Sequence, residues 1–186
     1  MKSLLVFACL FFITLTSSNC KKDKHRNAVD QLPAKTQTGA NTFGCIVNGK
    51  VFLPKGNSLT PRLKCAYQFL NTDYSKGYFF QLSAGDLSNQ NDIKGVGIYT
   101  DSLAIKTGNY NLGENKKGSA YASYIIISNQ ENKSIYTQNN LPGQLTITKF
   151  DETNQIVAGT FWFSTVNTNG DTTKVTDGRF DMKFSK

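Results

Sequence analysis

The chain has few residues that could support catalysis, because its only histidine is His25, near the N-terminus. Ser-His-Asp and Cys-His mechanisms need an imidazole beside the nucleophile, and zinc sites often use histidine ligands. No Asp-rich loop has the spacing that wraps a calcium ion. From residue 42 onward we therefore predict no catalytic residue, cofactor or metal site, and we expect a protein that is not an enzyme.

Carboxylates remain as candidates, because a pair of them can hydrolyse a glycosidic bond. Asp151 and Glu152 are sequence neighbours in a predicted turn, where Asp serves turn geometry. Asp177 and Asp181 lie on one predicted strand, about 13 Å apart by strand rise, which exceeds glycosidase spacing. We expect all four to be solvated rather than to converge on a pocket, and Asp177-Gly178 predicts a bulge.

Two cysteines, Cys45 and Cys65, lie in predicted strands of the domain. In an oxidising compartment such a pair is a candidate disulfide. The alternative is two buried free thiols that behave as small hydrophobic groups. The residues leave both interpretations open.

Tyrosines are spread over several predicted strands, and aromatic rings with polar rims can stack on sugars. An amphipathic tyrosine also fits the edge of a sheet, with its hydroxyl in water, and we favour that interpretation. The candidates for an aromatic patch are Tyr99, Tyr110, Tyr121, Tyr124, Tyr136 and Trp162.

Two short motifs resemble sites of O-glycosylation in exported proteins of Bacteroidetes-type bacteria. They are Asp101-Ser102-Leu103 and Asp171-Thr172-Thr173, each close to a predicted turn. Ser102 and Thr172 are therefore candidate glycosylation sites.

The elements that position these residues are short strands separated by turns, without a sustained helical period. Asn48-Gly49 lies between two apolar runs, and both positions suit a type I′ hairpin. About ten strands predict an all-β fold, an antiparallel β-sandwich or a flattened barrel. Besides the hairpin over 44–53, the expected strands are 62–70, 78–84, 95–100, 108–112, 120–128, 134–137, 144–150, 156–166 and 172–184.

The last two expected strands alternate clearly between apolar and polar residues, which indicates one buried and one wet face. Trp162 lies on the face opposite its two phenylalanine neighbours. We expect one core that contains Phe161, Phe163, Phe180, Met182 and Phe184.

Residues 1–19 predict a signal peptide. Lys2 precedes an apolar run over 4–15, which is shorter than the roughly 20 residues of a membrane-spanning helix. Ser17-Ser18-Asn19-Cys20 resembles the lipobox of bacterial lipoproteins, although Asn19 departs from the usual Gly or Ala. Cys20 is therefore the expected lipidation site, where acyl chains such as palmitate anchor the protein to the membrane.

Residues 20–41 are polar and aperiodic, so we predict a flexible tether ahead of an all-β domain over 42–186. The formal net charge is +8. Residues 1–41 have six Lys/Arg and two Asp/Glu, so half of this excess lies in the first 41 residues. Attraction to anionic headgroups explains such a charge, and we do not expect a nucleic-acid partner.

The two ends of the domain resemble an uncharacterised lipoprotein family (a domain of unknown function) from Bacteroidetes-type bacteria. The opening stretch is 42–54 (TFGCIVNGKVFLP), and the closing stretches are 145–151 (LTITKFD), 159–161 (GTF) and 176–181 (TDGRFD). The resemblance implies fold and compartment. It supplies no activity and no site residues.

These observations predict a lipid-anchored protein of the cell envelope, at the outer membrane, on its periplasmic face or at the cell surface. Its domain is expected to bind or to pack rather than to catalyse, with a glycan or an envelope protein as partner. The alternative is a carboxylate-based glycan hydrolase or an accessory carbohydrate-binding module.

Overall fold

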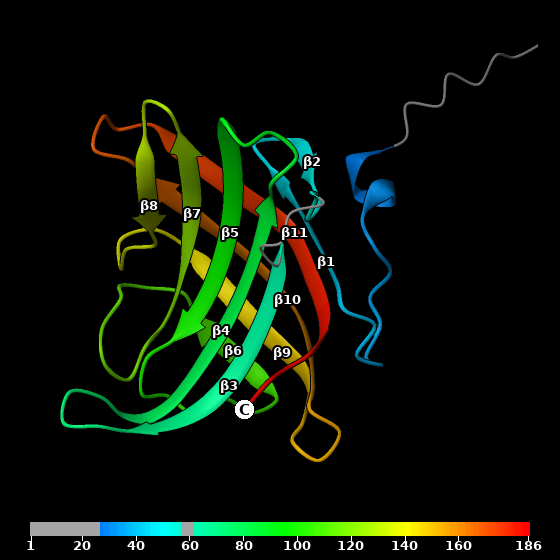
Figure 1. The fold of residues 1–186 in the computed structure, drawn as a ribbon, viewed down its shortest axis with the longest axis vertical. Helices are drawn as coiled ribbons and strands as arrows, with labels where there is room; N and C mark the ends of the chain where they lie inside the picture. Colours follow the sequence, from blue (N-terminus) through cyan, green and yellow to red (C-terminus); the bar gives the residue numbers. More distant parts are fainter. Residues whose placement is uncertain (1–26, 57–61) are drawn as a thin grey trace, which may run out of the picture.

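Two antiparallel sheets pack face to face in the computed structural model, which describes residues 27–56 and 62–186 (Figure 1). The six-stranded sheet has the order β2-β1-β11-β10-β9-β6, and the five-stranded sheet has the order β3-β4-β5-β7-β8. The first sheet contains β1 (Thr42–Val47), β2 (Lys50–Phe52), β6 (Gly108–Asn111), β9 (Gly143–Asp151), β10 (Ile156–Val166) and β11 (Thr172–Lys183). The second contains β3 (Leu63–Asn71), β4 (Lys76–Asp86), β5 (Asp92–Thr100), β7 (Ala120–Ser128) and β8 (Asn132–Tyr136).

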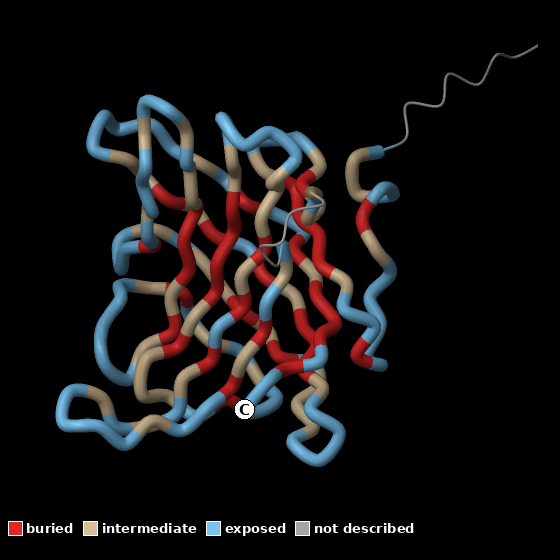
Figure 2. Tube along the Cα trace, viewed as in Figure 1, coloured by how far each residue is buried: buried red, intermediate tan, exposed pale blue. Residues whose placement is uncertain are grey.

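The predicted all-β fold is confirmed as a β-sandwich, since the two sheets are not closed into a barrel. Buried residues follow the middle of the strands, whereas the connecting loops are exposed (Figure 2). The expected core is also confirmed, because its five predicted side chains are each at most 3 % exposed and belong to one hydrophobic cluster. Among the described residues, no helix is both long and apolar enough to cross a membrane.

Local backbone features also follow the sequence. Asn48 and Gly49 have φ of 48° and 80° and connect β1 to β2, as the hairpin prediction requires. The register of β11 shifts against both of its neighbours between Val175 and Arg179, and Asp177 has φ of 53°. The bulge predicted at Asp177-Gly178 is therefore confirmed.

The predicted tether is corrected where the structure describes it. Residues 27–41, here called the strap, contain the short 3₁₀ helix η2 (Ala28–Gln31) and run beside β1 (Figure 1). Leu32 is buried, and a Cβ on Gly44 of β1 would lie only 2.7 Å from the ring of Pro33. The strap is thus packed on the outer face of the six-stranded sheet. Cys20 and His25 lie outside the described residues.

The end of the chain covers one lateral edge of the sandwich. After β11, the amide of Ser185 donates to the carbonyl of Cys65 in β3 (3.1 Å), and Tyr67 donates back to Ser185 (2.8 Å). The edge of the five-stranded sheet at β3 is therefore partly paired. At the other edge, β8 is paired with β7 alone among the described strands.

Candidate functional site

Three tyrosines lie on adjacent strands of the outer face of the five-stranded sheet. Tyr99 of β5 pairs with Tyr121 of β7, and their rings stack with centroids 5.1 Å apart. Tyr136 of β8 lies next, with its ring centroid 6.0 Å from that of Tyr121. We call Tyr99, Tyr121 and Tyr136 the tyrosine row.

Small residues beneath these rings explain how the row forms. Gly97 lies two positions before Tyr99 on the same face, and a Cβ there would collide with the ring of Tyr99. Ser123, opposite Gly97, pairs with Tyr136 on its other side and is fully buried. The rings therefore lean over a shallow trough of small side chains, which fixes their orientation.

The central hydroxyl of the row, that of Tyr121, stays protonated at physiological pH. Burial, together with the neighbouring Tyr136, Tyr99 and Asp101, raises the pKa of Tyr121 to about 12. Beneath the row, the hydroxyl of Ser123 is buried without a hydrogen-bond partner in the described part of the chain. The site thus offers hydroxyl groups next to aromatic carbon.

The exposed fractions of the three tyrosines and the side chains beside them determine which ligand groups can contact the row. Tyr136 is 43 % exposed, while Tyr99 and Tyr121 are half-buried. Gln81 of β4 pairs with Tyr99, and Ser134 of β8 lies two residues from Tyr136 on the same face, so neutral polar groups flank the rings. Such a surface can stack on an apolar ring face and hydrogen-bond to hydroxyls around it.

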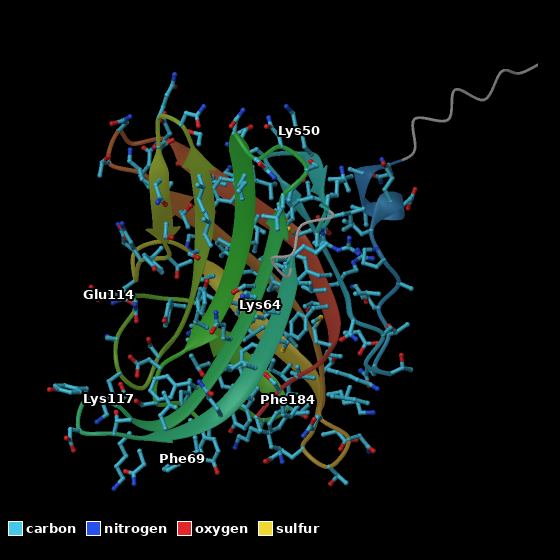
Figure 3. The ribbon with its side chains drawn as sticks, viewed as in Figure 1. Lys50, Lys64, Phe69, Glu114, Lys117 and Phe184 are labelled. Atoms are coloured by element: carbon cyan, nitrogen blue, oxygen red, sulfur yellow. The ribbon has the colours of Figure 1, made fainter. Side chains whose placement is uncertain are left out.

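A groove of about 640 Å³ begins where the row ends. It runs along β8 and is lined on its other side by Glu114, Asn115 and residues 166–168. Glu114 lies beside β8 on the loop before β7 (Figure 3). A ligand longer than the row therefore has room to continue past the edge of the sheet.

The remaining aromatic candidates lie elsewhere. Tyr124 is only 9 % exposed and belongs to the core, so this candidate does not contribute to a surface patch. Tyr110 lies in β6 of the other sheet, where its hydroxyl bonds to the backbone of Lys106. Trp162 is 43 % exposed on the outer face of the six-stranded sheet. Alternation along β7 places Tyr124 on the face opposite Tyr121, whereas only strand order separates Tyr110 and Trp162 from the row.

One carboxylate contradicts the expectation that all four are solvated. Asp181 is 1 % exposed and accepts hydrogen bonds from the strap, because the strap covers the outer face of β11. Glu152 and Asp177 are exposed, as expected. Asp151 is half-buried and caps the β9–β10 turn, where hydrogen bonds from the side chain and backbone of Asn154 lower its pKa.

The candidate disulfide is absent from the structure, which holds Cys45 and Cys65 as buried free thiols. Cys45 lies in β1 and Cys65 in β3, so the two belong to different sheets. Burial raises the pKa of Cys65 to about 12 and that of Cys45 well above its usual range. Both thiols are therefore protonated and unreactive in the folded domain.

The two candidate glycosylation sites differ in accessibility. Thr172 is exposed at the start of β11. Ser102 is half-buried with φ of 51°, and its hydroxyl donates to Asp101 at 2.8 Å. Within the described ranges, no group of three His, Cys, Asp or Glu side chains could hold a metal ion.

The fold and the row define the chain as an antiparallel β-sandwich with an aromatic outer face. Residues 87–182 match the family described as domain of unknown function (DUF6252), and the chain belongs to that family. The match includes the closing stretches of the domain and begins after the opening stretch over 42–54. No curated protein and no solved structure matches the chain.

Proposed function

We propose that this protein is a lipoprotein of the bacterial outer membrane whose sandwich binds a glycan without transforming it. The tyrosine row is the observation on which the proposal rests. It combines aromatic faces and hydroxyl groups with polar side chains on a sheet face that no described segment covers. A pyranose ring presents the complementary surface, since its axial C–H groups form an apolar face bordered by hydroxyls.

The anchor is supported by the N-terminal sequence. A positive residue, a short apolar run and Ser17-Ser18-Asn19-Cys20 follow one another in the order of a lipoprotein signal. The closing stretches, which lie within the family match, resemble lipoproteins of Bacteroidetes-type bacteria. Acyl chains at Cys20 would hold the domain stably at a membrane.

Fatty-acid labelling tests the anchor. Cells grown with a radioactive fatty acid should label the protein, and Cys20→Ser should abolish the label and release or stall the chain. Label retained in the Cys20→Ser variant would place the lipid elsewhere and would refute the assignment.

Glycan binding is tested with the full-length Cys20→Ser chain, titrated calorimetrically with neutral oligosaccharides of glucose, xylose and N-acetylglucosamine. We expect Tyr136→Ala to weaken binding about tenfold, the loss of about one stacking contact. Trp162→Ala is the matched control, because Trp162 has the same exposed fraction on the opposite outer face. Equal losses in both variants, or no binding to any oligosaccharide, would refute the proposal. Binding of extended peptides through Tyr136 instead would assign the row to protein recognition.

A further inference from the structure

The strap is held by a buried carboxylate. One oxygen of Asp181 accepts hydrogen bonds from the hydroxyl of Thr36 (2.6 Å) and from the amide and hydroxyl of Thr38 (2.9 and 3.1 Å). The other oxygen accepts the amide of Gly39 at 2.7 Å. Asp181 is 1 % exposed, so these bonds form away from water, where they are strongest.

Further contacts hold the strap along its length. Lys149 of β9 donates to the carbonyl of Gln37 (3.1 Å), and the amide of Lys183 donates to the side chain of Asn41 (2.9 Å). Near the start of the strap, Leu32 and Pro33 pack over Gly44. The contacts reach β1, β9 and β11, so the whole strap moves with the sheet.

This packing shortens the reach of a lipid anchor. Asn27 is seven residues after Cys20, whereas Thr42 is 22 residues after it. A fully extended chain covers about 25 Å over seven residues and about 75 Å over 22. The r.m.s. length of a flexible chain falls less steeply, from about 26 Å over 22 residues to about 15 Å over seven. A lipid at Cys20 therefore allows the domain far less freedom than a tether over 20–41 would.

We propose that the strap is a mount that holds the β2 end of the sandwich against an anionic membrane surface. The inference rests on the proposed lipid anchor at Cys20. Helix η2 at the start of the strap contacts β1 and β2, and Lys50 at the start of β2 lies at that end of the molecule (Figures 1 and 3). Residues 21–26 carry four Lys/Arg and one Asp, a charge that anionic headgroups attract.

The mount also orients the tyrosine row. The backbone of Asp86, at the end of β4, forms an isolated parallel β-bridge with that of Lys55 shortly after β2, so these residues share the mounted end. Tyr99 pairs with Gln81, five residues before Asp86 and about 17 Å from it by strand rise. The row therefore lies away from the membrane end and faces the solvent beside the domain.

Energy transfer to the membrane tests the mount. The lipidated full chain, purified from membranes, is reconstituted in vesicles of phosphatidylethanolamine and phosphatidylglycerol (3:1) that contain a headgroup-labelled acceptor. Donor dyes are attached through Lys50→Cys, at the mounted end, or Tyr74→Cys, 98 % exposed at the tip of the β3–β4 hairpin. We expect at least twofold more efficient transfer from position 50 than from position 74.

A spacer insertion tests whether the short chain between Cys20 and the strap is what keeps the domain close to the membrane. Fifteen Gly/Ser residues inserted between Arg26 and Asn27 should reduce transfer from position 50 and remove most of the contrast with position 74. The same spacer between Asn139 and Asn140, two exposed loop residues, is the control and should leave the contrast unchanged. Equal transfer from both positions in lipidated, spacer-free protein would refute the mount and leave the anchor intact. Mass spectra without a lipid on Cys20 would refute the anchor and the mount together.

Discussion

The two outer faces of the sandwich are built from similar strands but are used differently. On the six-stranded sheet, the strap covers Asp181, which is 1 % exposed. On the five-stranded sheet, no described segment covers the tyrosine row, and Tyr136 keeps 43 % of its surface exposed. The covered face can hold an ionised carboxylate in a fixed set of hydrogen bonds. The uncovered face keeps aromatic surface available to a ligand.

The difference shows that an outer sheet face is not automatically a binding surface. Polar residues at alternating strand positions predict contact with water on both sheets. On one of them a segment that is distant in sequence takes the place of water. Its backbone amides and threonine hydroxyls supply the hydrogen bonds that a buried carboxylate requires.

Removing the carboxylate of Asp181, which accepts the hydrogen bonds of the strap, should have the largest effect on the free energy of unfolding. Asp181→Ala leaves the donors of Thr36, Thr38 and Gly39 without their acceptor, and we expect a loss of about 2–4 kcal/mol in the free energy of unfolding. Urea unfolding measures it. Asp177→Asn, at an exposed position on the same strand where asparagine also tolerates the positive φ, is the control and should change stability by less than about 0.5 kcal/mol. Similar losses in both variants would contradict the role of the strap.

A larger side chain at Gly44, beneath the strap, should have the next largest effect on the free energy of unfolding. In Gly44→Val, the new Cβ would lie 2.7 Å from Pro33 and 2.9 Å from Leu53, so the strap must shift outward. We expect a cost of about 1–3 kcal/mol and faster proteolysis within residues 27–41. Mass spectrometry of the fragments locates the cleavage. Unchanged resistance of this segment would mean that its packing on Gly44 does not protect it.

Acid should loosen the covered face. Burial acts to raise the pKa of Asp181, but the hydrogen bonds from Thr36, Thr38 and Gly39 outweigh it and hold the pKa below its ordinary value. A carboxyl group whose pKa is lowered by folding stabilises the fold when ionised. This contribution is complete above the unfolded value of about 4 and is lost as the pH falls through the lower folded value. The stability difference between wild type and Asp181→Asn should therefore shrink between pH 6 and pH 2, and a constant difference would contradict the assignment.

The two thiols report which sheet opens more readily. Cys45 is 0 % exposed in the sheet under the strap, whereas Cys65 is 8 % exposed in the edge strand β3. With iodoacetamide at pH 8, we expect both to react fully after unfolding and slowly in the folded protein, Cys65 before Cys45. Peptide mass spectrometry gives the order. Protein made in an oxidising compartment that shows no reactive thiol after unfolding would instead contain the Cys45–Cys65 bridge.

The smallest effects on stability are expected at the exposed aromatics. Tyr136→Ala and Trp162→Ala each remove a side chain that is 43 % exposed, so each should lower stability by less than about 1 kcal/mol. Thermal unfolding measures both. A much larger loss for Tyr136→Ala would mean that the tyrosine row chiefly shields Ser123 and Gly97 rather than presenting a ligand surface.

The sequence alone determined much of the fold, because strand alternation and turn chemistry act locally. Phe180, Met182 and Phe184 were assigned to the core from a period of two. The Asn48-Gly49 hairpin and the bulge at Asp177-Gly178 followed from residues that tolerate positive φ. The strand expected over 62–70 corresponds to β3, Leu63–Asn71.

Tertiary structure alone decided what covers each outer face. The strap lacks an apolar period, and its order depends on Asp181, more than 140 residues away. The tyrosine row depends on the order β5-β7-β8, which places Tyr99, Tyr121 and Tyr136 side by side. Local sequence patterns report which side of a strand a residue occupies. They do not report which strand or segment lies beside it, because that is set by contacts between residues far apart in the chain.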